Sequence, residues 1–155
     1  MRKILIIDDD PAEITRLEVY LREKGFEPLS ALNGTEGLQK AESEAPEIIL
    51  LDRLLPDIDG LSLLGRIKRT LTDSYVIMIT AHQDMEFIIQ AMHLGAYEYL
   101  PKPICLDELF IIIEKIMENQ ALNKKLAHLL TSVAQDYKVN NIIGNSRSME
   151  QIFKT

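Results

Sequence analysis

Short apolar runs recur along the first part of the chain, and a longer segment with helical periodicity follows each of them. The runs are short enough for strands and are rich in isoleucine, leucine, valine and tyrosine. They cover residues 3–7, 27–32, 48–52, 75–80 and 97–100. Four apolar residues in succession precede Asp52, a pattern typical of a strand buried on both faces of a parallel sheet.

The segments between these runs predict helices. Their apolar positions recur at helical spacing, and glycines such as Gly25 and Gly95 close two of them. The predicted helices cover residues 11–24, 35–44, 61–72 and 85–94, and a longer one, capped by Asp107, begins near Glu108. Because strands and helices alternate along the chain, the sequence predicts an α/β fold with a doubly wound parallel sheet.

Composition and charge narrow the functional classes. The net charge of −7 argues against a fragment that grips a phosphate backbone by itself, and no helix-turn-helix is evident. The single cysteine, Cys105, excludes an internal disulfide, and its place after an apolar segment predicts a buried thiol. The apolar run at residues 3–7 is too short for a signal peptide or a membrane span. We therefore expect a cytoplasmic protein with no direct nucleic-acid binding by this fragment and no membrane association.

Polar residues with complementary chemistry lie at the ends of four predicted strands. Asp8 and Asp9 follow the first strand, Asp52 the third, Thr80 the fourth and Lys102 the fifth. The carboxyl ends of the strands in such a sheet converge on one edge. Three carboxylates in one place repel one another without a cation, and hard oxygen ligands favour Mg²⁺. The set suits transfer of a phosphoryl group to a carboxylate nucleophile.

Each of these residues also has a plain structural interpretation. Asp52 fits a turn cap, and Asp8 and Asp9 fit the N-terminus of the first helix, where acidic side chains complement the helix dipole. Thr80 fits an ordinary strand end, and Lys102 fits a solvated loop charge. Their conjunction at four strand ends favours the shared site.

The motifs that contain these residues resemble those of the receiver domain of two-component response regulators. The resemblance covers residues 1 to about 120, in the order of that family. It rests on Ile6–Pro11, Leu51–Gly60, Ile79–Ala81 and Gly95–Pro103. It implies a flavodoxin-like fold with strand order 2-1-3-4-5 and a C-terminal helical extension. It also implies a sensor histidine kinase as the partner that phosphorylates Asp52.

The resemblance assigns a role to each site residue. Asp8, Asp9, Asp52 and the backbone carbonyl of Leu54 are implied to hold Mg²⁺. Lys102 is implied to bind the phosphoryl group, with a cis peptide bond before Pro103. Thr80 is implied to swing toward the phosphoryl group, and Tyr99 to turn inward behind it.

Two further residues are rim positions. Arg53 is the residue after the acceptor. A functional interpretation is that it slows dephosphorylation or contacts the kinase, and the alternative is a solvated charge at the rim of the site. His82, two residues after Thr80, has only a weak claim to a catalytic role.

The end of the chain resembles another module. Residues 141–152 are similar to the opening of the AAA+ module in sigma-54-dependent activators of the nitrogen-regulator type. We therefore expect a receiver domain over residues 1–120, a linker helix over 121–138 and the truncated start of an AAA+ domain over 139–155. Helical character is expected to continue to Ala134, to break at 136–141 and to resume as a short segment up to Phe153. The phosphate-loop motif of ATPases is absent from the sequence, so this chain is not the ATPase.

An apolar stripe with a period of 3.5 residues runs along the last long helix and predicts a coiled-coil homodimer through residues of about 106–135. Asn119 and Asn123 interrupt the stripe. The alternative is one amphipathic helix that folds back on its own domain. The predicted a positions are Leu109, Ile116, Asn123, Leu130 and Tyr137, and the d positions are Ile112, Asn119, Leu126 and Val133.

The sequence thus favours a phosphorylation-dependent switch for sigma-54-dependent transcription, with no enzymatic turnover beyond its own phosphorylation and dephosphorylation. A stand-alone receiver that signals by protein docking is the alternative. A Mg²⁺-dependent hydrolase with Asp52 as nucleophile would need a general acid and a substrate pocket that the sequence does not indicate. A flavodoxin-like nucleotide binder would need a glycine loop where Asp9, Asp10 and Pro11 stand.

Overall fold

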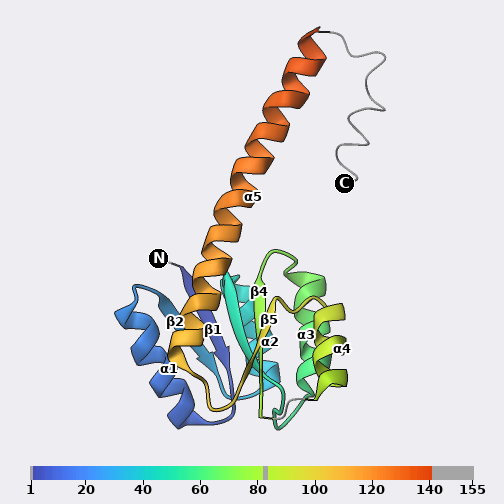
Figure 1. Ribbon diagram of the computed structural model, residues 1–155. Helices are drawn as coiled ribbons and strands as arrows, with labels where there is room; N and C mark the ends of the chain where they lie inside the picture. Colours follow the sequence, from blue (N-terminus) through green and yellow to red (C-terminus); the bar gives the residue numbers. More distant parts are fainter. Residues whose placement is uncertain (1, 82–83, 141–155) are drawn as a thin grey trace. The chain divides into compact units, whose positions relative to one another are not determined.

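The computed structural model describes residues 2–81 and 84–140, the last ten of these as backbone only. Five strands form one parallel sheet in the order β2-β1-β3-β4-β5 (Figure 1). The strands are β1 (Lys3–Ile7), β2 (Glu27–Ala31), β3 (Ile48–Asp52), β4 (Tyr75–Thr80) and β5 (Glu98–Pro101). This order confirms the predicted doubly wound α/β fold, in which the direction of winding reverses between β1 and β3.

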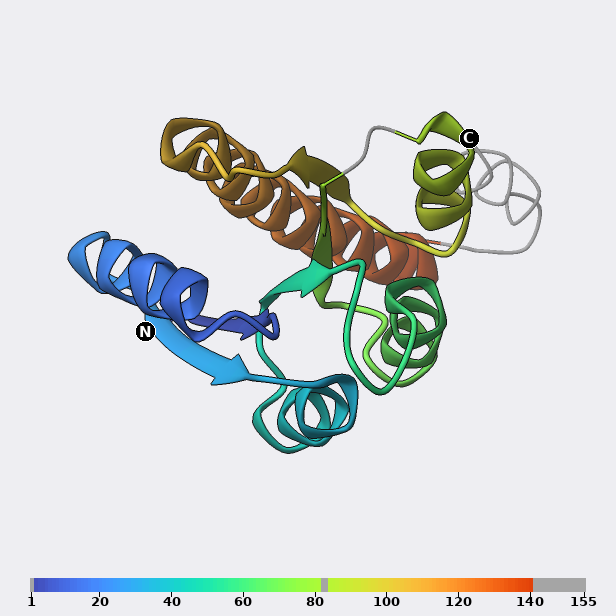
Figure 2. The same cartoon turned by 90° about the horizontal axis from the view of Figure 1, so that it is seen from below.

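Five helices connect or follow the strands. They are α1 (Pro11–Glu23), α2 (Gly34–Glu44), α3 (Gly60–Thr70), α4 (Met85–His93) and α5 (Leu106–Asn140). Seen from below, α1 lies on one face of the sheet, with the start of α5 on the same side, and α2, α3 and α4 cover the other face (Figure 2). Two hydrogen bonds tie α1 to the segment that opens α5: Arg16 donates to the carbonyl of Ile104 at 2.8 Å, and Tyr20 donates to that of Leu106 at 3.3 Å.

The core consists of side chains from the central strands and the helices on both faces. Every residue of β3 is buried, as the uninterrupted apolar run predicts. In register with it, Ile4–Ile7 of β1 and Val76–Ile79 of β4 are also fully buried. Packing of these apolar side chains fixes the three central strands in place. It therefore also fixes the positions of the polar residues at the strand ends.

Local signals place the helix ends where the sequence predicts them. The side chain of Asp10 accepts a hydrogen bond from the backbone N–H of Ala12, with Pro11 in the first turn of α1. Asp84 caps α4 in the same way, through the N–H of Glu86. Gly25 and Gly95 follow α1 and α4 with φ angles of 90° and 107°, which side chains other than hydrogen disfavour.

Three predictions near α5 are wrong. The helix starts at Leu106, so Asp107 lies in its first turn and does not cap it. Cys105 is exposed rather than buried, because it precedes the first turn and not an apolar face. The helix also continues through residues 136–140, which contain neither proline nor glycine to stop it.

The chain divides into two compact units, Met1–Ile112 and Ile113–Thr155. The boundary expected between receiver and linker at residue 120 lies inside the continuous helix α5. The short helical segment and the AAA+ resemblance expected at 141–155 lie outside the described residues. Within the described part of the chain, no helix is both long and apolar enough to cross a membrane.

Candidate functional site

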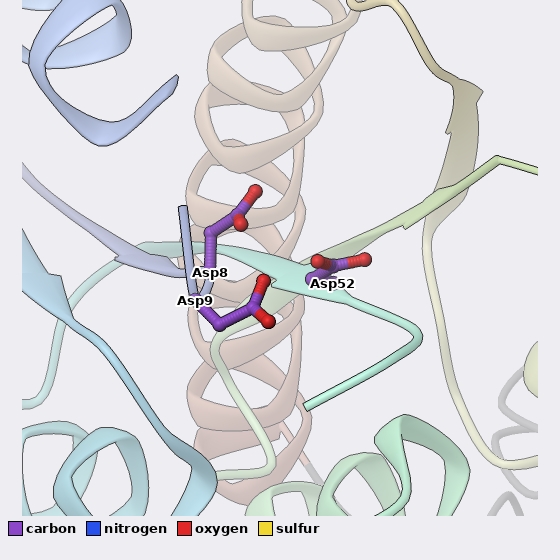
Figure 3. A group of neighbouring side chains, drawn as sticks. All are labelled: Asp8, Asp9 and Asp52. Atoms are coloured by element: carbon purple, nitrogen blue, oxygen red, sulfur yellow. The ribbon is translucent and has the colours of Figure 1, made fainter. Parts of the chain in front are cut away.

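Three carboxylates meet at the carboxyl edge of the sheet. Asp8 and Asp9 directly follow β1, and Asp52 is the last residue of β3. One carboxylate oxygen from each lies within 4.8 Å of the others, and Figure 3 shows the three groups gathered where the strands end. The predicted convergence of Asp8, Asp9 and Asp52 is thus present.

Asp8 is the buried member of the group. One of its oxygens, Oδ1, accepts a hydrogen bond from the N–H of Asp10 at 2.9 Å. The other, Oδ2, is buried without a hydrogen-bond partner, and its ion pair with the Nζ of Lys102 is long, at 3.5 Å. Burial, together with the charges of Asp52 and Asp9, raises the pKa of Asp8 to about 6, although the Asp10 bond and Lys102 oppose this rise. An oxygen in this position fits the ligand set of a hard divalent cation.

Lys102 provides the positive charge. Its Nζ donates a hydrogen bond to Oδ2 of Asp52 at 3.0 Å. Burial lowers the pKa of Lys102, but the hydrogen bond to Asp52 and the charges of Asp52 and Asp8 outweigh burial, so the pKa is raised overall. The N–H of Lys102 donates to the carbonyl of Thr80 at 2.9 Å, and the peptide bond to Pro103 is cis, as the resemblance implies.

Thr80 and Tyr99 lie on the two strands beyond Asp52. Thr80 ends β4, is fully buried, and is in register with Pro101. Tyr99 lies in β5, in register with Met78, and is partly buried against the core. Both residues occupy the strands that the sequence assigned to them.

The loop from Asp52 to Gly60 is closed on itself. The N–H of Gly60 donates to the carbonyl of Arg53 at 2.9 Å, and Leu54 pairs with Asp59 in an isolated bridge. A Cβ at Gly60 would lie 2.7 Å from the Arg53 carbonyl oxygen and 2.8 Å from that of Asp52. Only glycine permits this approach, which explains the Asp-Gly pair at the end of the loop.

Arg53 packs against α4. Its guanidinium carbon lies 4.1 Å from the centroid of the Phe87 ring, and Nη2 lies 3.9 Å from Oδ2 of Asp84. Of its side chain 26% is exposed, so Arg53 lies at the rim of the site, partly in solvent and partly against α4. His82 lies outside the described residues.

The sequence pattern does not reveal the role of one residue of this loop, Asp57. The carboxylate of Asp57 accepts hydrogen bonds from the N–H groups of Gly34 and Thr35, at the N-terminus of α2. These bonds lower the pKa of Asp57 to about 2, with the Thr35 hydroxyl contributing most. No local pattern announces a contact between two loops so far apart in the chain.

A family model described as the response regulator receiver domain matches residues 4–114. The chain belongs to this family. Among curated relatives of the receiver, regulatory protein AtoC of Escherichia coli K12 is 30% identical over 154 residues, which are 99% of this chain and 33% of AtoC. The DNA-binding transcriptional regulator NtrC of Proteus hauseri is 30% identical over 151 residues, 97% of this chain and 31% of NtrC. The receiver chain therefore spans about a third of the length of these relatives.

Solved receivers share the fold. A CheY-like receiver domain from Methanospirillum hungatei JF-1 is 33% identical, with a TM-score of 0.74, over 78% of this chain and 98% of that one. The receiver domain of DrrB described as BeF3 activated is 29% identical, with a TM-score of 0.70, over 76% of this chain and 98% of that one.

Proposed function

We propose that this receiver is a phosphorylation-dependent switch in which Asp52 accepts a phosphoryl group from a sensor histidine kinase in the presence of Mg²⁺. The observation that carries the proposal is the pairing of Asp52 with Lys102 beside two further carboxylates. This arrangement combines a nucleophile, a set of cation ligands and a fixed positive charge at one edge of the sheet.

The chemistry is a single transfer. An oxygen of Asp52 forms a bond to phosphorus as the bond from phosphorus to the histidine nitrogen of the kinase breaks. The electron pair leaves with the imidazole, which takes up a proton. Asp8, Asp9, Asp52 and the carbonyl of Leu54 would hold Mg²⁺, which neutralises charge on the phosphoryl oxygens. The unpartnered Oδ2 of Asp8 supports this ligand set.

Lys102 and Thr80 respond to the new group. The Nζ of Lys102, 3.0 Å from Asp52, is close enough to pair with phosphoryl oxygens. The hydroxyl of Thr80, on the adjacent strand β4, would swing toward the phosphoryl group. Its movement would leave room for Tyr99 to turn inward. The surface formed by α4, β5 and the start of α5 would then differ between the two states.

The output we infer is control of sigma-54-dependent transcription by a cytoplasmic activator of the NtrC type. The similarity to AtoC and NtrC extends over nearly the whole chain, including residues beyond the matched receiver model. In this account the chain has no substrate turnover of its own. A stand-alone receiver that acts by docking a partner is the second candidate, because two similar structures are described as receiver domain proteins and the match covers 98% of each of those chains.

The same proposal includes a homodimer through the second half of α5. Three leucines on this part of the helix are more than half exposed: Leu122, Leu126 and Leu129. Apolar residues spaced four and three positions apart on an exposed helix are typical of a coiled-coil seam. Of the three, only Leu126 is a predicted a or d position, so the exposed leucines lie beside the predicted seam rather than along it.

Beryllofluoride, which mimics a phosphoryl group, tests the proposal. With Mg²⁺ present, it should bind the native chain and shift amide resonances at Thr80 and Tyr99 as well as in the loop after Asp52. Asp52→Asn should show none of these shifts, whereas Asp73→Asn, a change at an exposed residue outside the site, should behave like the native chain. Shifts confined to the Asp52 loop would contradict the switch, and binding by Asp52→Asn would contradict the acceptor.

A further inference from the structure

The carboxylate of Asp57 joins the acceptor loop to the N-terminus of α2. Its Oδ1 accepts from the N–H of Gly34 at 2.7 Å, and its Oδ2 accepts from the N–H of Thr35 at 2.9 Å and from the hydroxyl of Thr35 at 2.6 Å. Three short bonds to one carboxylate fix its position in two directions.

The fit between the two segments is also steric. A Cβ at Gly34 would lie 1.9 Å from Cγ2 of Ile58, the residue next to Asp57. Gly34 therefore lets the acceptor loop lie directly on the first turn of α2. The contact is a hydrogen-bonded clip with a close apolar contact beside it.

Helix α2 does not depend on this clip for its own start. Asn33 is its N-cap and accepts from the N–H of Glu36 at 2.8 Å, while Glu36 accepts from the N–H of Leu32 at 3.3 Å. The N-cap bond and the bond to the residue before it close the start of α2 with the helix's own side chains. What Asp57 adds is an attachment for the loop in which it lies.

That loop carries the backbone group that completes the proposed cation site. Leu54 pairs with Asp59 across the loop, so residues 54–59 form a small closed unit between Asp52 and α3. The bridge fixes the base of this unit, and Asp57 fixes its tip.

We propose that Asp57 is a positioning residue for the metal site, holding the loop so that the Leu54 carbonyl stays directed at the cation. This inference rests on the proposed function, since it takes Mg²⁺ as the ligand of Asp8, Asp9 and Asp52. A residue that tightens the surroundings of a metal ligand typically changes metal affinity by roughly tenfold or more.

The test compares Mg²⁺ affinity among variants by isothermal titration calorimetry. Asp57→Asn retains the size of the side chain but leaves one acceptor oxygen, whereas both oxygens of Asp57 accept hydrogen bonds from Gly34 and Thr35. Asp59→Asn is the matched control, because it removes the same charge from the same loop and its side chain makes no capping bond to α3. We expect Asp57→Asn to weaken Mg²⁺ binding roughly tenfold, and Asp59→Asn to stay within about twofold of the native chain.

A second pair of variants tests the clip from its other side, and serves if Asp57→Asn does not fold. Thr35→Val removes the 2.6 Å hydroxyl bond, whereas Thr35→Ser retains it. Thr35→Val should weaken Mg²⁺ binding and Thr35→Ser should not. In the native chain Mg²⁺ should shift the ¹³C resonance of the Leu54 carbonyl, and Asp57→Asn should reduce that shift at saturating Mg²⁺.

The outcomes separate the two proposals. Equal Mg²⁺ affinity and an equal Leu54 carbonyl shift in Asp57→Asn and Asp59→Asn, with only stability lowered, would make Asp57 a helix cap and overturn the inference alone. Absence of Mg²⁺ binding in the native chain would overturn the proposed function and this inference with it.

Discussion

The guanidinium of Arg53 lies over the ring of Phe87, 4.1 Å from its centroid, and so connects the residue next to the acceptor with helix α4. The 3.9 Å contact with Asp84, the N-cap of α4, is on the same helix. A phosphoryl group on Asp52 would therefore compete with Phe87 and Asp84 for the Arg53 guanidinium.

Arg53→Gln should therefore weaken the coupling between the acceptor and α4. We expect the shift of the Phe87 ring resonances on beryllofluoride binding to shrink, because the cation that faces both groups is gone. In urea denaturation the variant should lose about 0.5–1 kcal/mol, the range of an exposed cation–π pair. Arg66→Gln, which changes an exposed arginine on α3, should leave both quantities unchanged, and an equal shift in Arg53→Gln would refute the coupling.

Asp8→Asn should stabilise the chain when Mg²⁺ is absent. Burial raises the pKa of Asp8 from 3.8 to about 6, so its ionised form at pH 7 destabilises the folded state relative to its neutral form. Neutral asparagine should raise the free energy of unfolding by about 1–3 kcal/mol. Added Mg²⁺ should then stabilise the native chain but not the variant. Thermal unfolding with and without Mg²⁺ measures both effects, and a destabilised Asp8→Asn would disprove this account of the carboxylate cluster.

Asp8, whose pKa is raised by folding, lowers stability as pH rises. Asp57, whose pKa is lowered by folding, should have the opposite effect. Hydrogen bonds lower the pKa of Asp57 to about 2 in the folded chain. Its contribution is therefore present above the unfolded pKa of about 4 and is lost as pH falls toward 2. The stability difference between the native chain and Asp57→Asn should be full at pH 6 and shrink between pH 4 and 2. Urea denaturation at several pH values checks this, and a difference that grows in acid would contradict it.

The predicted seam of α5, which includes the exposed Leu126 and the half-buried Leu130, gives a prediction about assembly. Replacing Leu126 and Leu130 with glutamate should convert a dimer to a monomer in sedimentation, because paired charges at a coiled-coil seam repel. Phosphorylation of Asp52 should be unaffected in this variant. Lys124 and Lys125, also exposed but off the predicted seam, provide the control when both are replaced by glutamate. A native chain that sediments as a monomer at tens of micromolar would exclude the coiled coil.

The features predicted from sequence share one cause. Uninterrupted apolar runs identify the strands, and a parallel sheet brings the polar residues that end them to one edge. That is why the sequence alone groups Asp8, Asp52, Thr80 and Lys102. This grouping requires only the position of each strand end, and each strand ends where its buried apolar run gives way to a polar residue.

The features that escaped prediction depend on contacts between loops. Asp57 meets Gly34 only because β1 and β3 are neighbours and the loop after β3 folds back toward α2. Arg53 reaches Phe87 for a similar reason. Neither contact has a local signature, because each joins segments more than 20 residues apart. The start of α5 was misplaced by two residues, since Asp107 suits a first turn as well as a cap.

The central claim is that Asp52 is the phosphoacceptor, and intact mass after incubation with Mg²⁺ and acetyl phosphate tests it most directly. We expect one added phosphoryl group per native chain, none in EDTA and none in Asp52→Asn. The control Asp59→Asn should be labelled like the native chain. Stable labelling of Asp52→Asn, or labelling of the native chain undiminished by EDTA, would contradict the assignment.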